Sequence, residues 1–366
     1  MVLKVNRMIT YATDNQKQNL IDCWKTAFPA DSEVFVDFYF EKKYQNENTL
    51  LYLKDDEIAA SLQMLPYKMS YYKRSINTSY ISGAMTMPQY RNQGLMKDLL
   101  IHAFGAMRKR GDVLTMLIPQ EPWLIDYYKK MGYTSCFEYE LTEINPNDYP
   151  QFPDKMRFKE FELADFKGAY EFYKRYLAGQ NLCVQKSQTD FSIMVEECQN
   201  FEGNVYALVD KGNTVGLCFC FCSKGKVILK DCIAENENYR QYFLSKLTQK
   251  FKNQSIFLYS PVVESSNAVV LGMARIVNVF KLMQLFAKVH PHLEFSVKVG
   301  DEHLLENNVT LSVSNGRVTI ITSQIVDFEL TIEKLTQILL GYHISSLEEK
   351  YAIFPQQHPY MSLMLE

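Results

Sequence analysis

The sequence predicts an α/β protein, because a strand–turn–helix–strand unit lies in its first third and further alternations of strands and helices follow. Thr78–Thr86 is expected to form the first strand of this unit, and Val113–Ile118 the second, which Pro119 ends. At 366 residues the chain is long enough for two or three domains. The helix between the strands carries apolar residues at core-facing spacing: Met96, Leu99, Leu100, Ala103, Phe104 and Met107.

The turn between the first strand and the helix, Gln89–Gly94, is the predicted centre of a functional site. The first backbone N–H groups of a helix have no partner within the helix, and the helix dipole favours an anion there. Arg91 adds a fixed positive charge, and Gly94 lets a bulky phosphate approach the backbone. The pattern therefore predicts a phosphate-binding turn.

The residues before this unit predict an antiparallel meander and two helices. The expected strands are Arg7–Ala12, Thr49–Leu53 and Ala59–Tyr72. A first helix follows the capping pair Thr13-Asp14, and a second helix is expected at Asp31–Tyr44. The second helix is rich in aromatic side chains, and core packing is the expected role of most of them: Phe35, Phe38, Tyr39, Phe40 and Tyr44.

Two segments of the chain resemble the GNAT N-acetyltransferase superfamily. Arg91-Asn92-Gln93-Gly94-Leu95-Met96 resembles its Arg/Gln-x-x-Gly-x-Gly/Ala pyrophosphate loop, with Met96 in place of the last small residue. Tyr127-Tyr128-Lys129-Lys130-Met131-Gly132-Tyr133 resembles its Tyr-x-x-x-Gly-Phe/Tyr segment. A helix and a strand separate the two segments, which is the order found in that superfamily.

This resemblance implies a β-α-α-β-β-β-α-β core that binds acetyl-CoA as cosubstrate and acetylates an amine. It implies that the strand containing Met116–Pro119 parts from its neighbour, so that freed backbone groups bind the pantetheine arm, and that the first two helices border the acceptor. Tyr128 aligns with the general acid near the sulfur, a role that suits a phenol with a pKa of about 10; Tyr127 is expected to pack or to line the pocket. The implied cofactor-binding residues are Ala84, Thr86, Arg91, Asn92, Gln93, Gly94, Leu95 and Met96.

Beyond the turn-rich segment Asn145–Pro150 the pattern restarts in a degraded form. A helix is expected at Phe161–Tyr176, and strands at Val205–Val209, Thr214–Ser223 and Lys226–Ile233. The next helix opens with Arg240 where the first turn has Arg91, but Phe243 stands at the glycine position and would fill the space of a pyrophosphate. The sequence thus predicts a degenerate second GNAT-like domain, or an α/β layer that is merely similar.

A third region begins near Gly272. A helix is expected at Asn278–His290, followed by strands and by a capped helix at Thr331–Leu340. This order resembles a sterol-carrier-protein-like α+β domain, and Met273-Ala274-Arg275-Ile276-Val277-Asn278-Val279 is similar to its opening in the enhanced-intracellular-survival (Eis) family. The Eis-like layout implies a catalytic domain at 1–148, a degenerate domain at 149–272 and the third domain at 273–366, in a homo-oligomer.

The last residues, Pro359–Glu366, are apolar up to the last position but one. Chain ends are usually polar and frayed, so an apolar end suggests a docked terminus. In the Eis family the terminal carboxylate lies in the active site and relays a proton from the acceptor amine; here Glu366 supplies that carboxylate. The alternative is a tail that only packs. Glu121 and Asp126 are substitutes for the base.

Composition excludes several classes of protein. The net charge of −3 argues against nucleic acid as the main partner, because phosphate backbones need a concentrated basic face. No apolar run approaches the roughly 20 residues of a membrane span. Met1–Arg7 has no apolar signal core, so a cytoplasmic location is expected.

The eight cysteines raise the question of a metal or disulfide site. Cys218, Cys220 and Cys222 alternate with phenylalanines, which in a strand places the three thiols on one side. Such a row does not surround a tetrahedral ion, and the chain has no Cys-x-x-Cys pair. No metal is therefore expected, and the thiols are interpreted as small buried side chains in a reducing cytosol.

The sequence as a whole predicts an acetyl-CoA-dependent N-acetyltransferase. The acceptor is expected to be a small-molecule or peptide amine of the aminoglycoside, polyamine or lysine type, since a negative net charge suits a cation. Two alternatives stay open: a non-catalytic acyl-CoA sensor and a lipid carrier built on the third region.

Overall fold

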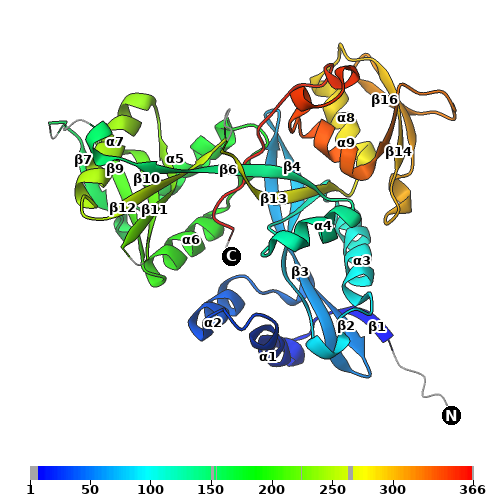
Figure 1. The fold of residues 1–366 in the computed structure, drawn as a ribbon, viewed down its shortest axis with the longest axis horizontal. Coiled ribbons are helices and arrows are strands. Elements are labelled where there is room, and N and C mark those ends of the chain that lie inside the picture. Colours follow the sequence, from blue (N-terminus) through cyan, green and yellow to red (C-terminus); the bar gives the residue numbers. More distant parts are fainter. Residues whose placement is uncertain (1–6, 150–151, 154, 224, 263–266, 365–366) are drawn as a thin grey trace. The chain divides into compact units, whose positions relative to one another are not determined.

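The structure is a computed structural model that describes residues 7–149, 152–153, 155–223, 225–262 and 267–364. The described chain divides into two compact units, each built from segments far apart in the sequence (Figure 1). Unit 1 takes the described residues of Met1–Lys68, Ile76–Cys136 and Gly272–Gln356. Unit 2 takes those of Met69–Ser75, Phe137–Leu271 and Gln357–Glu366. The predicted division into domains 1–148, 149–272 and 273–366 stays a prediction.

Unit 1 is built on a run of strands in the order β1-β2-β3-β4-β5-β13. These strands are β1 (Arg7–Tyr11), β2 (Thr49–Lys54), β3 (Glu57–Tyr71), β4 (Arg74–Thr86), β5 (Leu114–Leu117) and β13 (Val269–Ile276). β1, β2 and β3 pair antiparallel, whereas β4 and β5 pair in parallel, as a βαβ unit requires. The strands predicted for this region are confirmed to within a few residues. β13, which pairs antiparallel with β5, was not predicted.

The helices of unit 1 cover both sides of these strands (Figure 1). They are α1 (Lys17–Ala27), α2 (Glu33–Lys42), α3 (Leu95–Arg110) and α4 (Pro122–Lys130). The apolar side predicted for α3 is buried in one hydrophobic cluster with residues of β2, β3 and β4 and with Tyr128, Met131 and Tyr133; Met96 packs on this cluster from a partly buried position. The burial of this helix face supplies much of the free energy that holds α3 on the sheet.

α1 and α2 pack near Gly83, where β4 is irregular. Gly83 has a φ of +54°, and a Cβ added there would lie 2.3 Å from the Trp24 ring. The Tyr39 hydroxyl donates a hydrogen bond of 2.7 Å to the Ser82 hydroxyl beside it. Glycine is therefore required by both the backbone conformation and the indole, and it lets the helices approach the strand closely.

A second, smaller sheet in unit 1 has the strand order β16-β15-β14-β17. Its strands are β14 (Phe295–Gly300), β15 (Thr310–Ser314), β16 (Arg317–Ile320) and β17 (Phe328–Thr331), accompanied by α8 (Val279–Val289) and α9 (Ile332–Leu339). The predicted helix–strands–helix order is confirmed. β17, which pairs in parallel with β14, was missed. The likeness to a sterol-carrier-protein domain stays a prediction.

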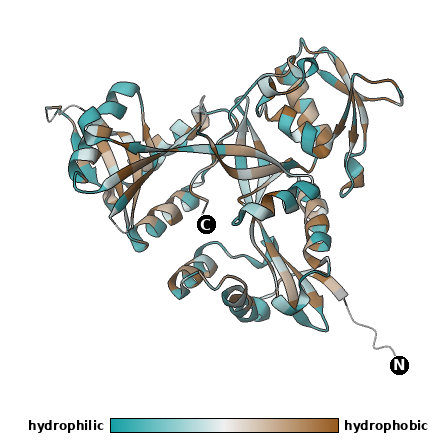
Figure 2. Ribbon diagram, viewed as in Figure 1, coloured by the Kyte–Doolittle hydropathy of each residue, from teal (hydrophilic) through white to brown (hydrophobic). Residues whose placement is uncertain are grey.

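Unit 2 contains strands in the order β6-β12-β11-β10-β9-β7. They are β6 (Thr134–Ile144), β7 (Arg157–Glu160), β9 (Gly203–Asp210), β10 (Asn213–Ser223), β11 (Lys226–Ala234) and β12 (Ser255–Pro261), and the short β8 (Val184–Gln185) pairs with the tip of β3. The helices are α5 (Phe166–Gly179), α6 (Gln188–Asn200) and α7 (Glu237–Lys250). Figure 2 shows hydrophobic residues concentrated along the strands and on one side of the helices. The sequence analysis did not predict β6, β7, β8, α6 or β12, and the helix expected at Phe161–Tyr176 begins at Phe166.

β10 separates two hydrophobic clusters by its alternation. Phe219 faces the cluster formed with α5 and α6, whereas Cys218 and Cys220 face the cluster formed with α7. The two thiol sulfurs are 3.7 Å apart. The predicted row of thiols on one side of the strand is confirmed.

Candidate functional site

The predicted phosphate-binding turn connects β4 to α3 through a short 3-10 turn, η3 (Pro88–Tyr90). Asn92 and Gly94 both adopt the left-handed conformation, with φ of 59° and 78°. Gly94 is the N-cap of α3, and no side chain caps the helix from this position. The first amide groups of α3 are thus left without a side-chain acceptor from the cap, as an anion site requires.

Gly94 also leaves the space in front of the helix open. A Cβ added to Gly94 would meet no atom within 4 Å, and Arg91, Asn92 and Gln93 are exposed. Leu95 is buried and Met96 partly buried, so these two anchor the first turn of α3 in the core. The turn therefore presents backbone and polar side chains outward while its helix stays fixed, an arrangement that fits a pyrophosphate.

Two cations lie at the turn. The Arg91 Nε donates to the Thr86 carbonyl at 3.2 Å, and the Lys54 Nζ donates to the Gln93 Oε1 at 3.1 Å. Lys54 comes from the end of β2 and also lies over the Tyr90 ring, 4.9 Å from its centroid. The sequence analysis missed Lys54, because no local pattern connects it with a turn nearly forty residues later.

The end of β4 extends beyond its pairing with β5. The register of this parallel pair runs from Thr78 with Leu114 to Tyr80 with Met116, whereas β4 continues to Thr86. Ala84 and Thr86, whose backbone groups were predicted to bind the pantetheine arm, thus lie in the part of β4 beyond its pairing with β5. The Thr86 carbonyl has Arg91 as its partner, so a ligand at this carbonyl would have to displace the guanidinium.

Tyr128 lies on α4 and is 7% exposed. Its ring packs against those of Tyr133 and Tyr127, with centroids 5.7 Å and 5.3 Å away. Burial is the main cause that raises the pKa of Tyr128 above its usual value, with smaller contributions from Tyr133 and Tyr127, so the hydroxyl is a proton donor at neutral pH. Among the residues that the structure describes, none forms a hydrogen bond with this hydroxyl.

Tyr127 differs from its neighbour in exposure, because it is only half-buried. Burial, followed by the negative charge of Asp98, raises the pKa of Tyr127 to about 12. Asp98 lies in the first turn of α3, so the charge that raises the pKa of Tyr127 is at the same helix end as Gly94. Both tyrosines therefore belong to the core that supports the turn.

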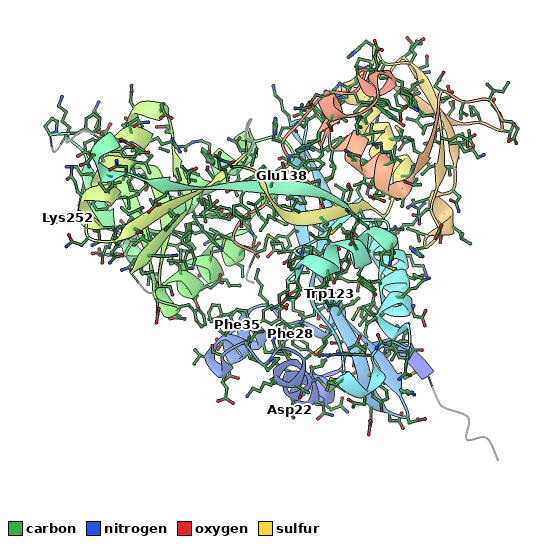
Figure 3. The ribbon with its side chains drawn as sticks, viewed as in Figure 1. Asp22, Phe28, Phe35, Trp123, Glu138 and Lys252 are labelled. Carbon is green, nitrogen blue, oxygen red and sulfur yellow. The ribbon has the colours of Figure 1, made fainter. Side chains whose placement is uncertain are left out.

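The side chains that border α4 are more exposed. Glu121 is the N-cap residue of α4, although its side chain makes no capping hydrogen bond, and Asp126 lies within the helix, 3.9 Å from the Lys129 ammonium. Trp123 is 66% exposed. Figure 3 labels it together with the partly buried Phe28 and Phe35, which come from the segment of α1 and α2. Of the aromatic residues predicted for α2, Phe38, Tyr39 and Phe40 are buried in the core.

The chain end is described as far as Met364, so Glu366, the predicted relay, lies outside the described residues. The preceding tail is docked within unit 2: Tyr360 and Leu363 belong to its hydrophobic cluster with α5 and α6. The buried Lys186 donates a 2.9 Å hydrogen bond to the Leu363 carbonyl, and the Tyr360 hydroxyl donates to the buried Asp231. The expectation of a docked apolar tail is therefore confirmed for these residues.

α7, the helix whose start was compared with that of α3 in the sequence, has a different N-terminus. The Asn236 side chain accepts a 3.0 Å hydrogen bond from the Tyr239 amide and so caps α7. Phe243 is fully buried in the cluster between α7 and the strands. This helix end has neither the open glycine nor the uncapped amides of α3.

No group of three or more His, Cys, Asp or Glu side chains is arranged to hold a metal ion in the described part of the chain. The described helices also include none that is both long and apolar enough to cross a membrane.

Comparison with known proteins supports the resemblance found in the sequence. Residues 8–136 match the family model described as acetyltransferase (GNAT) domain. Comparison with curated protein sequences gives no match.

Solved structures with a similar fold extend over nearly the whole chain. A GCN5-related N-acetyltransferase from Anabaena variabilis has a TM-score of 0.78 at 17% identity, covering 97% of this chain and 99% of its own. One from Kribbella flavida has a TM-score of 0.74 at 14% identity, covering 95% and 92%. Eis1 from Mycobacterium abscessus has a TM-score of 0.73 at 13% identity, covering 91% and 90%. Residues 8–136 thus match a GNAT acetyltransferase domain, and the chain as a whole shares the fold of these solved structures.

Proposed function

We propose that this protein is an acetyl-CoA-dependent N-acetyltransferase that acetylates a primary amine. The observation that carries the proposal is the open, uncapped N-terminus of α3 behind Gly94, with the cations Arg91 and Lys54 beside it. This turn is where the matched GNAT domain would bind the pyrophosphate of coenzyme A. In the proposed complex Asn92, Gln93 and the amides of Leu95 and Met96 complete the pyrophosphate cradle.

In the proposed reaction the amine nitrogen attacks the thioester carbon, a C–N bond forms and the C–S bond breaks. Ala84 and Thr86 of β4 would hold the pantetheine arm through backbone hydrogen bonds. Tyr128 would donate its proton, or a strong hydrogen bond, to the departing sulfur, which suits a buried hydroxyl that stays protonated. The proton released by the amine would pass through water to the α-carboxylate of Glu366.

A cationic amine is the proposed acceptor class, with aminoglycosides, polyamines and lysine side chains as members. The exposed Trp123 and the partly buried Phe28 and Phe35 are suited to stack on a flat or large acceptor. The homo-oligomer, the degenerate second domain and the sterol-carrier-like third domain belong to the same proposal.

Acetyl transfer measured by mass spectrometry tests the function directly. The full-length protein is incubated with acetyl-CoA and, separately, with an aminoglycoside, a polyamine and a lysine peptide. We expect an acceptor heavier by one acetyl group together with an equal amount of free coenzyme A. Calorimetric binding of acetyl-CoA without product from any amine would instead favour a sensor. Binding of a fluorescent acyl chain without acetyl-CoA binding would favour a lipid carrier.

The chain end provides a separate prediction. If the α-carboxylate of Glu366 is the proton relay, Glu366→Gln should keep kcat within about threefold, because the terminal carboxylate survives. Adding a few residues after Glu366, or amidating the terminus, should lower kcat by about a hundredfold or more, within the range for loss of a general base.

Thermal unfolding separates this relay from a tail that only packs. A packing role predicts that the extension lowers the melting temperature while amidation leaves kcat unchanged. Full activity of a folded, amidated protein would contradict the relay, and Glu121→Gln and Asp126→Asn would then identify the base.

A further inference from the structure

A fully buried ion pair joins the C-terminal segment of unit 1 to its first sheet. Both side chains of the pair, Arg275 on β13 and Asp301 after β14, are inaccessible to solvent. The Arg275 Nη2 donates to both carboxylate oxygens of Asp301, at 2.8 Å and 2.7 Å. Attraction to the guanidinium, reinforced by hydrogen bonds from Asn307 and the His303 amide, lowers the pKa of Asp301 despite its burial, so this carboxylate is ionised at neutral pH.

This pair is not explained by stability alone. The Arg275 Nε is buried and has no hydrogen-bond partner among the described residues. Burying two charges and an unpaired donor lowers the free energy of unfolding, and an apolar pair of similar volume would carry no such cost. Buried polar groups are therefore better understood here as fixing one specific geometry.

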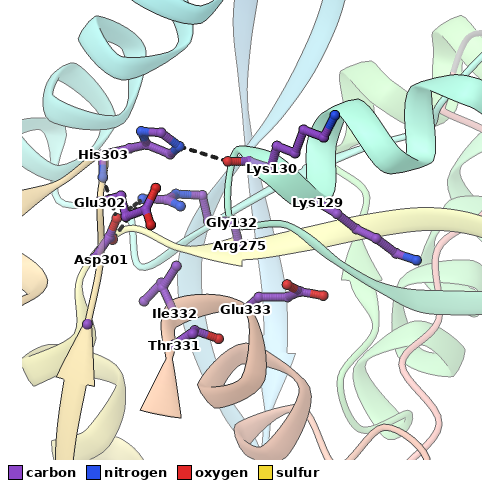
Figure 4. Close-up of a pocket in the computed structure, with 11 residues that line it drawn as sticks. Lys129, Lys130, Gly132, Arg275, Asp301, Glu302, His303, Thr331, Ile332 and Glu333 are labelled. Carbon is purple, nitrogen blue, oxygen red and sulfur yellow. Dashed lines mark hydrogen bonds and ion pairs between the residues drawn. The ribbon is translucent and has the colours of Figure 1, made fainter.

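The geometry that the pair fixes is the end of α4. The Arg275 Nη1 donates a 2.6 Å hydrogen bond to the Met131 carbonyl. The His303 Nε2 lies 2.8 Å from the Lys130 carbonyl (Figure 4). The last carbonyls of a helix have no partner within it, so these side chains provide the missing partners. Both come from the C-terminal segment of unit 1, more than 140 residues away along the chain.

Polar contacts and packing both hold this helix end, because Met131 and Tyr133 are also buried in the cluster with α3. A pocket of about 280 Å³ lies beside it, lined among others by Lys129, Glu302 and Glu333 (Figure 4).

Gly132, which has no side chain, leaves room for the Arg275 guanidinium. Its φ is +82°, and a Cβ added there would lie 1.9 Å from the Arg275 Nη1 and 2.7 Å from the Ile332 Cγ2. Gly132 of the Tyr127–Tyr133 segment and Arg275 of the Met273–Val279 segment therefore pack directly against each other. On the other side, the Arg275 guanidinium lies over the Phe104 ring, 4.2 Å from its centroid.

We propose that Arg275 and Asp301 are positioning residues for Tyr128. Tyr128 precedes Met131 by one helical turn, so the carbonyl that Arg275 holds fixes the rotation of α4 and thereby the direction of the Tyr128 hydroxyl. This inference rests on the proposed acetyl transfer with Tyr128 as the acid. It adds that the C-terminal segment of unit 1 is needed for turnover.

The test uses the full-length protein and the variant Arg275→Met/Asp301→Asn, which leaves no buried charge unpaired. We expect kcat to fall at least tenfold while KM for acetyl-CoA stays within twofold. KM should change little because the proposed phosphate-binding turn lies at the N-terminus of α3, whereas Arg275 contacts Phe104 further along that helix. Replacing Tyr128 by 3-fluorotyrosine gives a second readout: its ¹⁹F chemical shift should move in the double variant. A wild-type kcat and an unmoved signal in a folded double variant would overturn the proposal.

Arg108→Met is the matched control. The Arg108 Nη1 donates to the Val277 carbonyl and to the Asn307 side chain, so it joins the same segments and is linked to Asp301 through Asn307, but it donates no hydrogen bond to the described residues of α4. We expect it to lower the melting temperature but to leave kcat and the ¹⁹F signal of residue 128 unchanged. Equal losses of kcat in both variants would mean that Arg275 only stabilises the fold and does not position Tyr128. A wild-type protein that transfers no acetyl group refutes the proposed function instead, whereas the ¹⁹F shift still tests the positioning.

Discussion

Replacing Tyr128 by phenylalanine should lower kcat by roughly ten- to ten-thousand-fold, the range for the loss of a general acid. The substitution removes only the hydroxyl, which has no partner among the described residues, so the fold and the affinity for acetyl-CoA should change little. Steady-state kinetics with saturating acetyl-CoA measures the loss, and calorimetry measures the affinity. Because burial raises the pKa of Tyr128, no loss of rate from its ionisation is expected below about pH 10.

Tyr127→Phe is the control for this prediction, because the two tyrosines are adjacent on α4 and both have a raised pKa. We expect Tyr127→Phe to change kcat by less than about threefold. If it carried the large loss instead, the assignment of the acid within Tyr127–Tyr133 would be wrong by one residue. If neither substitution lowered kcat, the sulfur would leave without help from either phenol.

Replacing Gly94 by tryptophan should abolish measurable binding of acetyl-CoA. The space in front of the N-terminus of α3 is open, so an indole there would occupy the position proposed for the pyrophosphate. A non-glycine residue in the left-handed conformation costs roughly 1–2 kcal/mol of stability, which a folded domain can tolerate. Isothermal titration calorimetry with acetyl-CoA, together with thermal unfolding, separates loss of the site from loss of the fold.

Gly111→Trp is the matched control, because Gly111 ends the same helix that Gly94 begins. Gly111 is also left-handed, with a φ of 93°, and an added Cβ would meet only the Lys281 ammonium at 3.9 Å. The control should therefore lose similar stability but retain the affinity. Unchanged affinity in Gly94→Trp would refute the cofactor site. Phe243→Gly should create no second site, because Asn236 caps α7 and the rest of the turn is missing there.

Local patterns predicted the part of the fold that surrounds the site. The apolar spacing from Met96 to Met107 identified α3, and the alternation in Cys218–Cys222 identified a strand that separates two clusters. Arg91 and Gly94 identified the turn at the start of α3, and the structure shows that Gly94 has a left-handed backbone conformation there. These predictions succeeded because periodicity, capping and φ preference are properties of neighbouring residues.

The elements that the sequence analysis missed depend on distant partners. β13 was interpreted as the opening of a third region, but Met273–Ile276 pair with Leu114–Leu117 of β5. β17 is a short strand without clear alternation that pairs in parallel with β14. Lys54 joins the candidate site from the end of β2. None of these pairings leaves a periodic signal in its own segment.

By itself, the sequence determined the βαβ unit, the turn that opens α3 and the tyrosine segment that resembles the GNAT superfamily, because each depends on patterns within one short stretch of chain. Only the tertiary structure decided why Gly132 must be glycine and what holds the end of α4, since Arg275 lies 144 residues beyond Met131 along the chain. A buried charge is placed by the summed packing and hydrogen bonding around it, and no local preference specifies that sum.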